Sequence, residues 1–174
     1  MVTIEQVIYI VPILALTTSI LYYALNLRAS NKTQQLQLET RQTQLFMNLY
    51  ETYRSPEFRK VQMKIQTLEY TDFRDFWSKY GRDSNPDFWA EWFSVAAFYN
   101  GIGVLVRRNM LDINLVEELL SNIVIHSWEM MGDIILEWRK VIVTDMERRY
   151  DMLHGFEYLY NEIIARGTIR PNPL

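Results

Sequence analysis

The sequence predicts an all-α protein: an amino-terminal transmembrane helix that continues into a stalk, followed by a cytoplasmic bundle of about five helices. Three observations predict this class. A long run without a charge lies near the amino terminus, two proline-containing helix starts follow it, and no stretch shows the sustained alternation of a strand. The expected parts are an anchor over residues 1–29, a stalk over 30–54, a bundle over 55–166 and a flexible tail over 167–174.

The uncharged run covers residues 6–27, and 16 of its 22 residues are apolar. A helix of this length, rising about 1.5 Å per residue, spans a hydrocarbon core of about 30 Å. Arg28 and Lys32 follow the run directly, as a basic flank that suits anionic headgroups. Because all 18 Lys and Arg lie after residue 27, we expect a single pass through the cell membrane, with the amino terminus outside and the carboxy-terminal domain in the cytoplasm.

The stalk begins with a Gln-rich segment. Five of the eleven residues 34–44 are Gln, and the segment contains no Gly or Pro, which favours a solvated helix that continues the anchor. Leu38, Leu45 and Leu49 are spaced by seven and four residues, which permits a short coiled-coil contact with a second copy. The alternative is a helix that only sets the distance of the bundle from the bilayer.

Two proline-containing signatures place helices of the bundle. Ser55-Pro56-Glu57 and Asn85-Pro86-Asp87 each combine an N-cap residue, a proline at the first helical position and an acid in the first turn. The second helix has one charge between residues 88 and 106, so a second membrane span is an alternative. Glu91 and Asn100 would then lie in hydrocarbon, and the one-sided flanking helices need a core to pack on. A position at the centre of the bundle is therefore favoured.

Short polar residues and glycine mark the other helix ends. Thr71-Asp72 is expected to cap a short helix, which Gly81 ends in the left-handed conformation. Asp112 or Asn114 is expected to cap the next helix. The last two helices are expected from this cap to about residue 141 and over about 144–165.

Four stretches together resemble a known family. They are Leu49–Arg59, which reads LYETYRSPEFR, Ile102–Arg108 with the Asp112 that follows, the helix bearing Trp128 and Arg139, and Phe156–Leu159. In this pattern the chain is similar to a prokaryotic domain-of-unknown-function family of single-pass membrane proteins with a Gln-rich juxtamembrane helix and a small helical cytoplasmic domain. The resemblance implies a fold and a location, and it supplies no catalytic residues.

The residue content restricts the chemistry. The absence of Cys excludes disulfides, thiol nucleophiles and cysteine-ligated metals, and His126 and His154 are the only histidines, so no metal and no cofactor are expected. A net charge of −3 gives no footprint for nucleic-acid binding. The segment Asn100-Gly101-Ile102-Gly103 lies inside an expected helix, where it favours close helix packing over a phosphate cradle.

Arg149 and His154 are the candidate catalytic residues. An Arg and a His separated by four residues, in a helical domain, resemble the active-site motif of the helical RNases of prokaryotic toxin and defence systems. That resemblance implies a His that acts as general acid or base and an Arg that stabilises developing negative charge. Tyr150 departs from the pattern, because those enzymes usually place a small polar residue there. The alternative is two solvated polar residues on the final helix.

The expected function is that of a membrane-anchored interaction, scaffold or accessory module, which contacts the bilayer through residues 6–27 and a protein partner through its bundle. The alternatives are a membrane-tethered RNase and a small subunit of a larger membrane complex. An exposed aromatic or Met-rich surface on the bundle would favour docking. A polar cleft that joins Arg149 and His154 would favour the enzyme.

Overall fold

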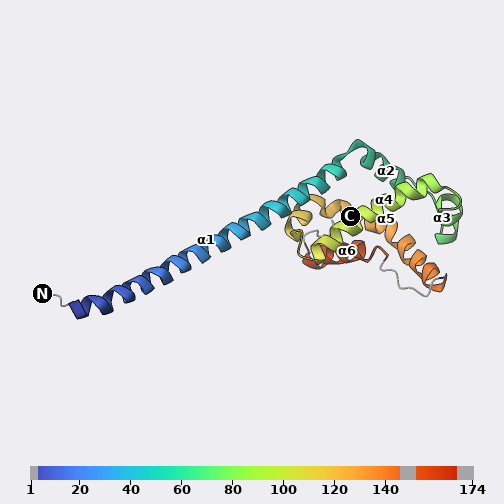
Figure 1. Cartoon of the computed structure of the whole chain (residues 1–174). Helices are drawn as coiled ribbons and strands as arrows, with labels where there is room; N and C mark the ends of the chain where they lie inside the picture. The colour runs from blue at the N-terminus through green and yellow to red at the C-terminus, as the bar shows by residue number, and fades with distance from the viewer. Residues whose placement is uncertain (1–3, 146–151, 168–174) are drawn as a thin grey trace. The chain divides into compact units, whose positions relative to one another are not determined.

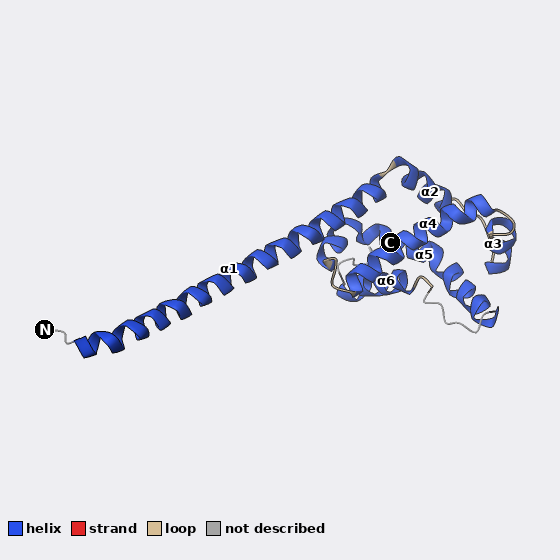
Figure 2. Cartoon of the chain, in the orientation of Figure 1, coloured by secondary structure: helices blue, strands red, loops and turns tan. Residues whose placement is uncertain are grey.

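The computed structural model describes the backbone of residues 4–145 and 152–167, and the side chains of residues 12, 14–141 and 152–167. Within this part the chain is helical, without a strand (Figures 1 and 2). The predicted all-α class is confirmed. The helices are α1 (Ile4–Arg54), α2 (Pro56–Gln66), α3 (Phe73–Tyr80), α4 (Pro86–Arg107), α5 (Ile113–Asp145) and α6 (His154–Arg166).

The chain divides into two compact units, residues 1–44 and residues 45–174. Helix α1 runs without a break through the first unit and into the second. In the first unit every described side chain is exposed except Gln42. The hydroxyls of Thr17 and Thr18 donate hydrogen bonds of 3.0 and 2.7 Å to the Leu14 carbonyl, and Ser19 donates one of 2.7 Å to Ala15. These hydroxyls therefore have acceptors within their own helix.

Among the residues whose side chains are described, no helix is long and apolar enough to cross a membrane. The described part of the uncharged run carries polar residues, Thr17, Thr18, Ser19 and Asn26, between its apolar ones. The transmembrane helix predicted over residues 1–29 is therefore not supported by the structure. Helix α4, the alternative second span, is not apolar enough either, since it carries Glu91 and Asn100.

Helix α4 is the central helix of the second unit, as the sequence predicted. It contacts α2, α3, α5 and α6, and it is buried around much of its circumference. Its buried residues are Phe88, Trp89, Trp92, Val95, Ala96, Tyr99, Ile102, Gly103 and Val106.

Helices α4 and α6 pack closely because glycines lie where they cross. A Cβ atom on Gly103 would overlap the carbonyl oxygen of Gly155, so both backbones approach closer than any side chain would permit. Asn100 Oδ1 accepts a 2.8 Å hydrogen bond from the Gly155 amide. Next to this contact the ring of Phe156 stacks on Tyr99, with 4.9 Å between centroids. The Asn100–Gly103 segment thus serves helix packing, as predicted.

Both proline-containing helix starts are confirmed. Ser55 Oγ accepts a 3.2 Å hydrogen bond from the Phe58 amide, and Asn85 Oδ1 accepts one of 3.2 Å from the Phe88 amide. In each helix the proline occupies the first helical position, where its missing N–H leaves no bond unmade.

Gly81 ends α3 as predicted, but its predicted left-handed conformation and the predicted start of the last helix were wrong. Gly81 has φ −70° and ψ 165°, an extended rather than left-handed backbone, and glycine suits this position because a Cβ would overlap the Trp77 carbonyl. Helix α5 extends through Thr144 to Asp145, so the final helix does not begin there. It begins at His154, because buried Leu153 has a φ of 61° and cannot continue a right-handed helix. The predicted tail beyond Gly167 lies outside the described residues.

Candidate functional site

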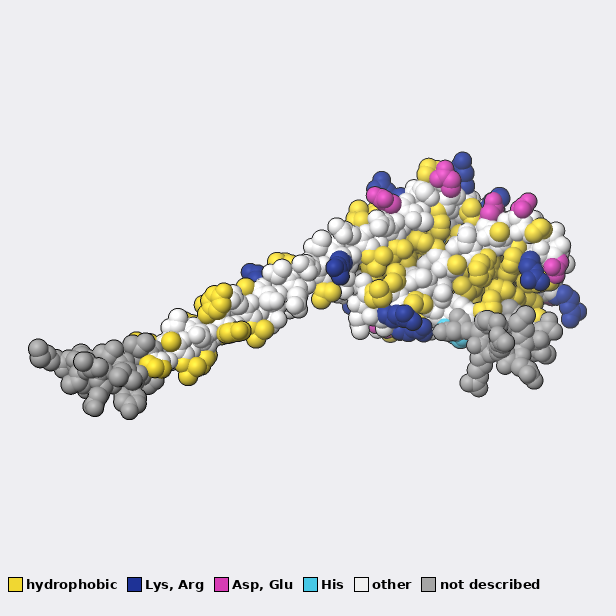
Figure 3. All heavy atoms as spheres, in the orientation of Figure 1, with side chains coloured by type: hydrophobic (Ala, Val, Ile, Leu, Met, Phe, Trp, Pro, Cys, Tyr) yellow, Lys and Arg dark blue, Asp and Glu magenta, His cyan; other side chains and the backbone are white. Residues whose placement is uncertain are grey.

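A cluster of aromatic rings joins α3, α4 and α5 at the surface of the bundle. We call Trp77, Trp89, Phe93 and Trp138 the aromatic face. Trp89 is buried, whereas Trp77, Phe93 and Trp138 are half-buried and pack against the core with one side only. Figure 3 shows hydrophobic side chains at the surface in this part of the bundle.

The rings of the aromatic face support one another edge to face. Trp138 lies at 85° to Trp89 with 4.9 Å between centroids, and at 88° to Phe93 with 6.0 Å. Trp77 lies 5.1 Å from Trp89. Such T-shaped pairs contribute about 0.5–1.5 kcal/mol beyond the area that they bury, so the rings stabilise one another. Val141, which is 52% exposed, lies one turn beyond Trp138 on α5 and extends the face.

A second feature is a buried polar cluster of Gln62, Tyr99 and Ser127. Gln62 Nε2 donates a 2.7 Å hydrogen bond to the Tyr99 hydroxyl, which also hydrogen-bonds to Ser127. Tyr99 is fully buried, and this burial raises the pKa of its hydroxyl well above the ordinary value of 10.0. The phenol is therefore neutral at any physiological pH.

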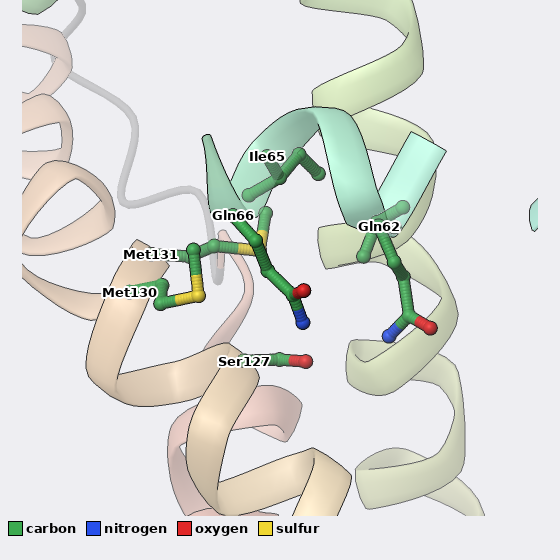
Figure 4. A pocket seen from close by; sticks show the side chains of 7 residues that line it. Gln62, Ile65, Gln66, Ser127, Met130 and Met131 are labelled. Carbon is green, nitrogen blue, oxygen red and sulfur yellow. The ribbon is translucent and has the colours of Figure 1, made fainter. Parts of the chain in front are cut away.

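A cavity of about 10 Å³ lies beside this polar cluster (Figure 4). In Figure 4 the Gln66 side chain from α2 points toward Ser127 on α5, and Gln62 points toward α4. The volume suits about one water molecule and excludes a metabolite. The lining residues are Gln62, Ile65, Gln66, Val95, Ser127, Met130 and Met131.

Arg139 on α5 holds the start of α6. Its Nε donates a 2.8 Å hydrogen bond to the Met152 carbonyl, and its Nη1 pairs with Glu157 Oε2 at 2.5 Å. His154 Nδ1 lies 3.6 Å from the same carboxylate oxygen, and its side chain is 46% exposed. Through Nε and Nη1 the guanidinium thus ties α5 to the residues around the start of α6, whereas its buried Nη2 has no hydrogen-bond partner among the described atoms.

The structure does not test the predicted catalytic pair. His154 is the first residue of α6, whereas Arg149 lies outside the described residues, so the Arg149–His154 pair stays a prediction. Arg28 and Lys32 are exposed on α1. Within the described part of the chain, no group of three His, Asp or Glu side chains is placed to hold a metal ion.

Sequence reasoning missed the aromatic face. Trp77 and Trp138 lie in helices that the sequence predicted, but neither residue was singled out as part of a site. The available signal was the residue type, because tryptophan is enriched at protein interfaces. What could not be predicted was that Trp138, near the end of α5, joins the rings of the consecutive helices α3 and α4.

Comparison with known proteins assigns the chain to a family. A family model described as a domain of unknown function, DUF4760, matches residues 11–163, so the chain belongs to this family. This confirms the resemblance to a domain-of-unknown-function family, although not its single-pass membrane character. No curated protein and no solved structure is detectably similar to the chain.

Proposed function

We propose that the protein is a membrane-associated docking module, in which the helical bundle binds a protein partner through the aromatic face. The observation that carries the proposal is that Trp77, Phe93 and Trp138 are only half-buried and lie in one cluster of ring contacts. Tryptophan supplies a large apolar contact area with few rotatable bonds, and it dominates the binding energy of many protein interfaces. The matching partner presents an apolar segment, such as one side of an amphipathic helix.

The cavity and the polar groups favour docking over catalysis. The described cavity beside Tyr99 admits about one water molecule, which is too little for a substrate. Arg139, the cation near His154, pairs with Glu157 instead of facing solvent. The RNase alternative therefore has less support than contact through the aromatic face.

Attachment to the cell membrane is the second part of the proposal. Its support is the sequence, where residues 6–27 carry no charge and Arg28 and Lys32 follow directly. The proposed arrangement places the amino terminus outside and the bundle in the cytoplasm. After alkaline carbonate extraction of native membranes, the full chain is expected in the pellet, and a chain that begins at Ser30 in the supernatant. Equal release of the two chains would contradict membrane attachment.

Docking is tested with a matched pair of substitutions on α5. Val141→Glu places a charge at the edge of the aromatic face, whereas Leu119→Glu changes a residue of similar exposure, 49%, about 33 Å away along the helix. In chemical crosslinking of native membranes, Val141→Glu is expected to reduce the adduct with the partner at least fivefold. Leu119→Glu is expected to leave the adduct unchanged.

Equal adduct from the two variants would exclude the aromatic face as the docking site, provided that circular dichroism shows both to be folded. The mass of the adduct separates the remaining possibilities. A product of twice the chain mass indicates self-association, for which the stalk with its exposed Leu38 is the predicted surface. Larger products indicate a subunit of a larger membrane complex.

A further inference from the structure

Helix α2 buries few apolar side chains for its length. Only Gln62 and Ile65 of its eleven residues are buried, and one of these two is polar. The thirteen-residue α6, in comparison, buries Phe156, Leu159 and Ile163 against the core. Because apolar burial is the main source of packing free energy, α2 gains less from its packing than α6 does.

Two contacts between α2 and α4 are polar ones that water can replace. Lys64 pairs with Glu91 at the surface, where both side chains are exposed to solvent. Gln62 bonds to the Tyr99 hydroxyl, and exchanging such a bond for bonds to water changes the free energy by only about 0.5–1.5 kcal/mol. Phe58 adds a ring contact with Phe98 from a half-buried position, with 4.7 Å between centroids.

The cavity beneath α2 has polar groups in its wall that can bind water. The cavity lies between α2 and the pair α4 and α5, and Gln62, Gln66 and Ser127 supply polar groups to its wall. Water that enters from this cavity would meet hydrogen-bonding partners rather than a dry core. The polar groups that separation at this surface exposes can therefore bond to water.

We infer that α2 is a detachable strap, which separates from α4 and α5 while α4, α5 and α6 stay packed. Local openings of this kind begin where few apolar groups are buried, and they cost less than global unfolding. The strap follows α1 with only Ser55 between the two helices. A displacement of the end of α1 therefore reaches α2 first, and opening uncovers Val95, Ser127 and Met131.

The absence of native Cys provides a direct test, because an introduced thiol is the only one in the chain. In Ser127→Cys the thiol lies under the strap, whereas in Val124→Cys it lies in the core one turn earlier on α5. Ser94→Cys, at an exposed position, gives the intrinsic rate of thiol labelling. All three full-length variants are labelled in mild detergent under native conditions.

We expect the Ser127→Cys variant to react at least tenfold faster than Val124→Cys after division by the Ser94→Cys rate. A smaller ratio means that both sites open only with the whole bundle, and it overturns the strap. Should either buried variant fail to fold, amide hydrogen exchange of the unmodified chain decides. The strap then requires α2 amides to exchange at least tenfold faster than those in the middle of α4, and equal rates overturn it.

Discussion

Replacing Gly103 by Ala is expected to lower the stability of the bundle by about 3 kcal/mol or more, or to prevent folding. The added methyl group would overlap the carbonyl oxygen of Gly155. This oxygen belongs to the backbone of a packed helix, so it cannot rotate away as a side chain could. Relief requires α6 to move away from α4, which would separate Phe156 from Tyr99. Thermal unfolding of the full chain, followed by near-ultraviolet circular dichroism, measures the effect.

Gly101 provides the matched control two residues away on the same helix. An added Cβ there meets nothing within 4 Å. Gly101→Ala is therefore expected to raise stability by up to about 1 kcal/mol, because alanine loses less backbone entropy than glycine in a helix. If both substitutions shift the unfolding midpoint in the same direction and by a similar amount, close packing of Gly103 on Gly155 is not what holds α4 and α6 together.

Tyr99 is expected to make the bundle unstable in alkali. Burial raises the pKa of its hydroxyl in the folded state above the value near 10 of the unfolded chain. The unfolded state then binds fewer protons than the folded state above pH 10, so the free energy of unfolding falls as the pH rises. The contribution is fully present below pH 10, and about 1.4 kcal/mol of it is lost by pH 11.

Tyr99→Phe separates this effect from general alkaline unfolding. At pH 8 the variant is expected to be less stable by about 1–2 kcal/mol, because Gln62 and Ser127 lose their hydrogen-bonding partner. At pH 11 the difference in the free energy of unfolding is expected to shrink to near zero. Ionisation of Tyr99 in the unfolded state lowers this free energy for the unmodified chain only. Denaturant titrations of both chains at the two pH values measure it. A difference that is the same at pH 8 and pH 11 would show that Tyr99 ionises equally in both states.

The sequence predicted those parts of the fold that depend on local chemistry. Pro56 and Pro86 start helices because a fixed φ and a missing N–H suit the first helical position anywhere. The start of α6 could not be predicted in this way. It depends on Leu153, whose left-handed backbone is tolerated because its side chain is buried in the core, and a contact of this kind leaves no local pattern.

The candidate site was predictable only in its composition. The sequence contains the tryptophans, but their function depends on exposure, and exposure is a property of the assembled bundle. Asn100 shows the same limit. It was expected to be a costly group for a membrane span, whereas in the structure its side chain accepts a hydrogen bond from Gly155 across two helices. Pairings between residues 55 positions apart are set by the fold and not by spacing along the chain.

The side-chain hydroxyls of the first unit influence the free-energy cost of moving α1 from water into a drier environment. Thr17, Thr18 and Ser19 donate to carbonyl oxygens of their own helix, and Thr33 and Thr40 do so further along. A hydroxyl that already has an acceptor needs no water for its proton, so its transfer to a drier environment costs less than that of a free hydroxyl. These residues therefore add little to the dehydration cost of α1, whatever surface it meets.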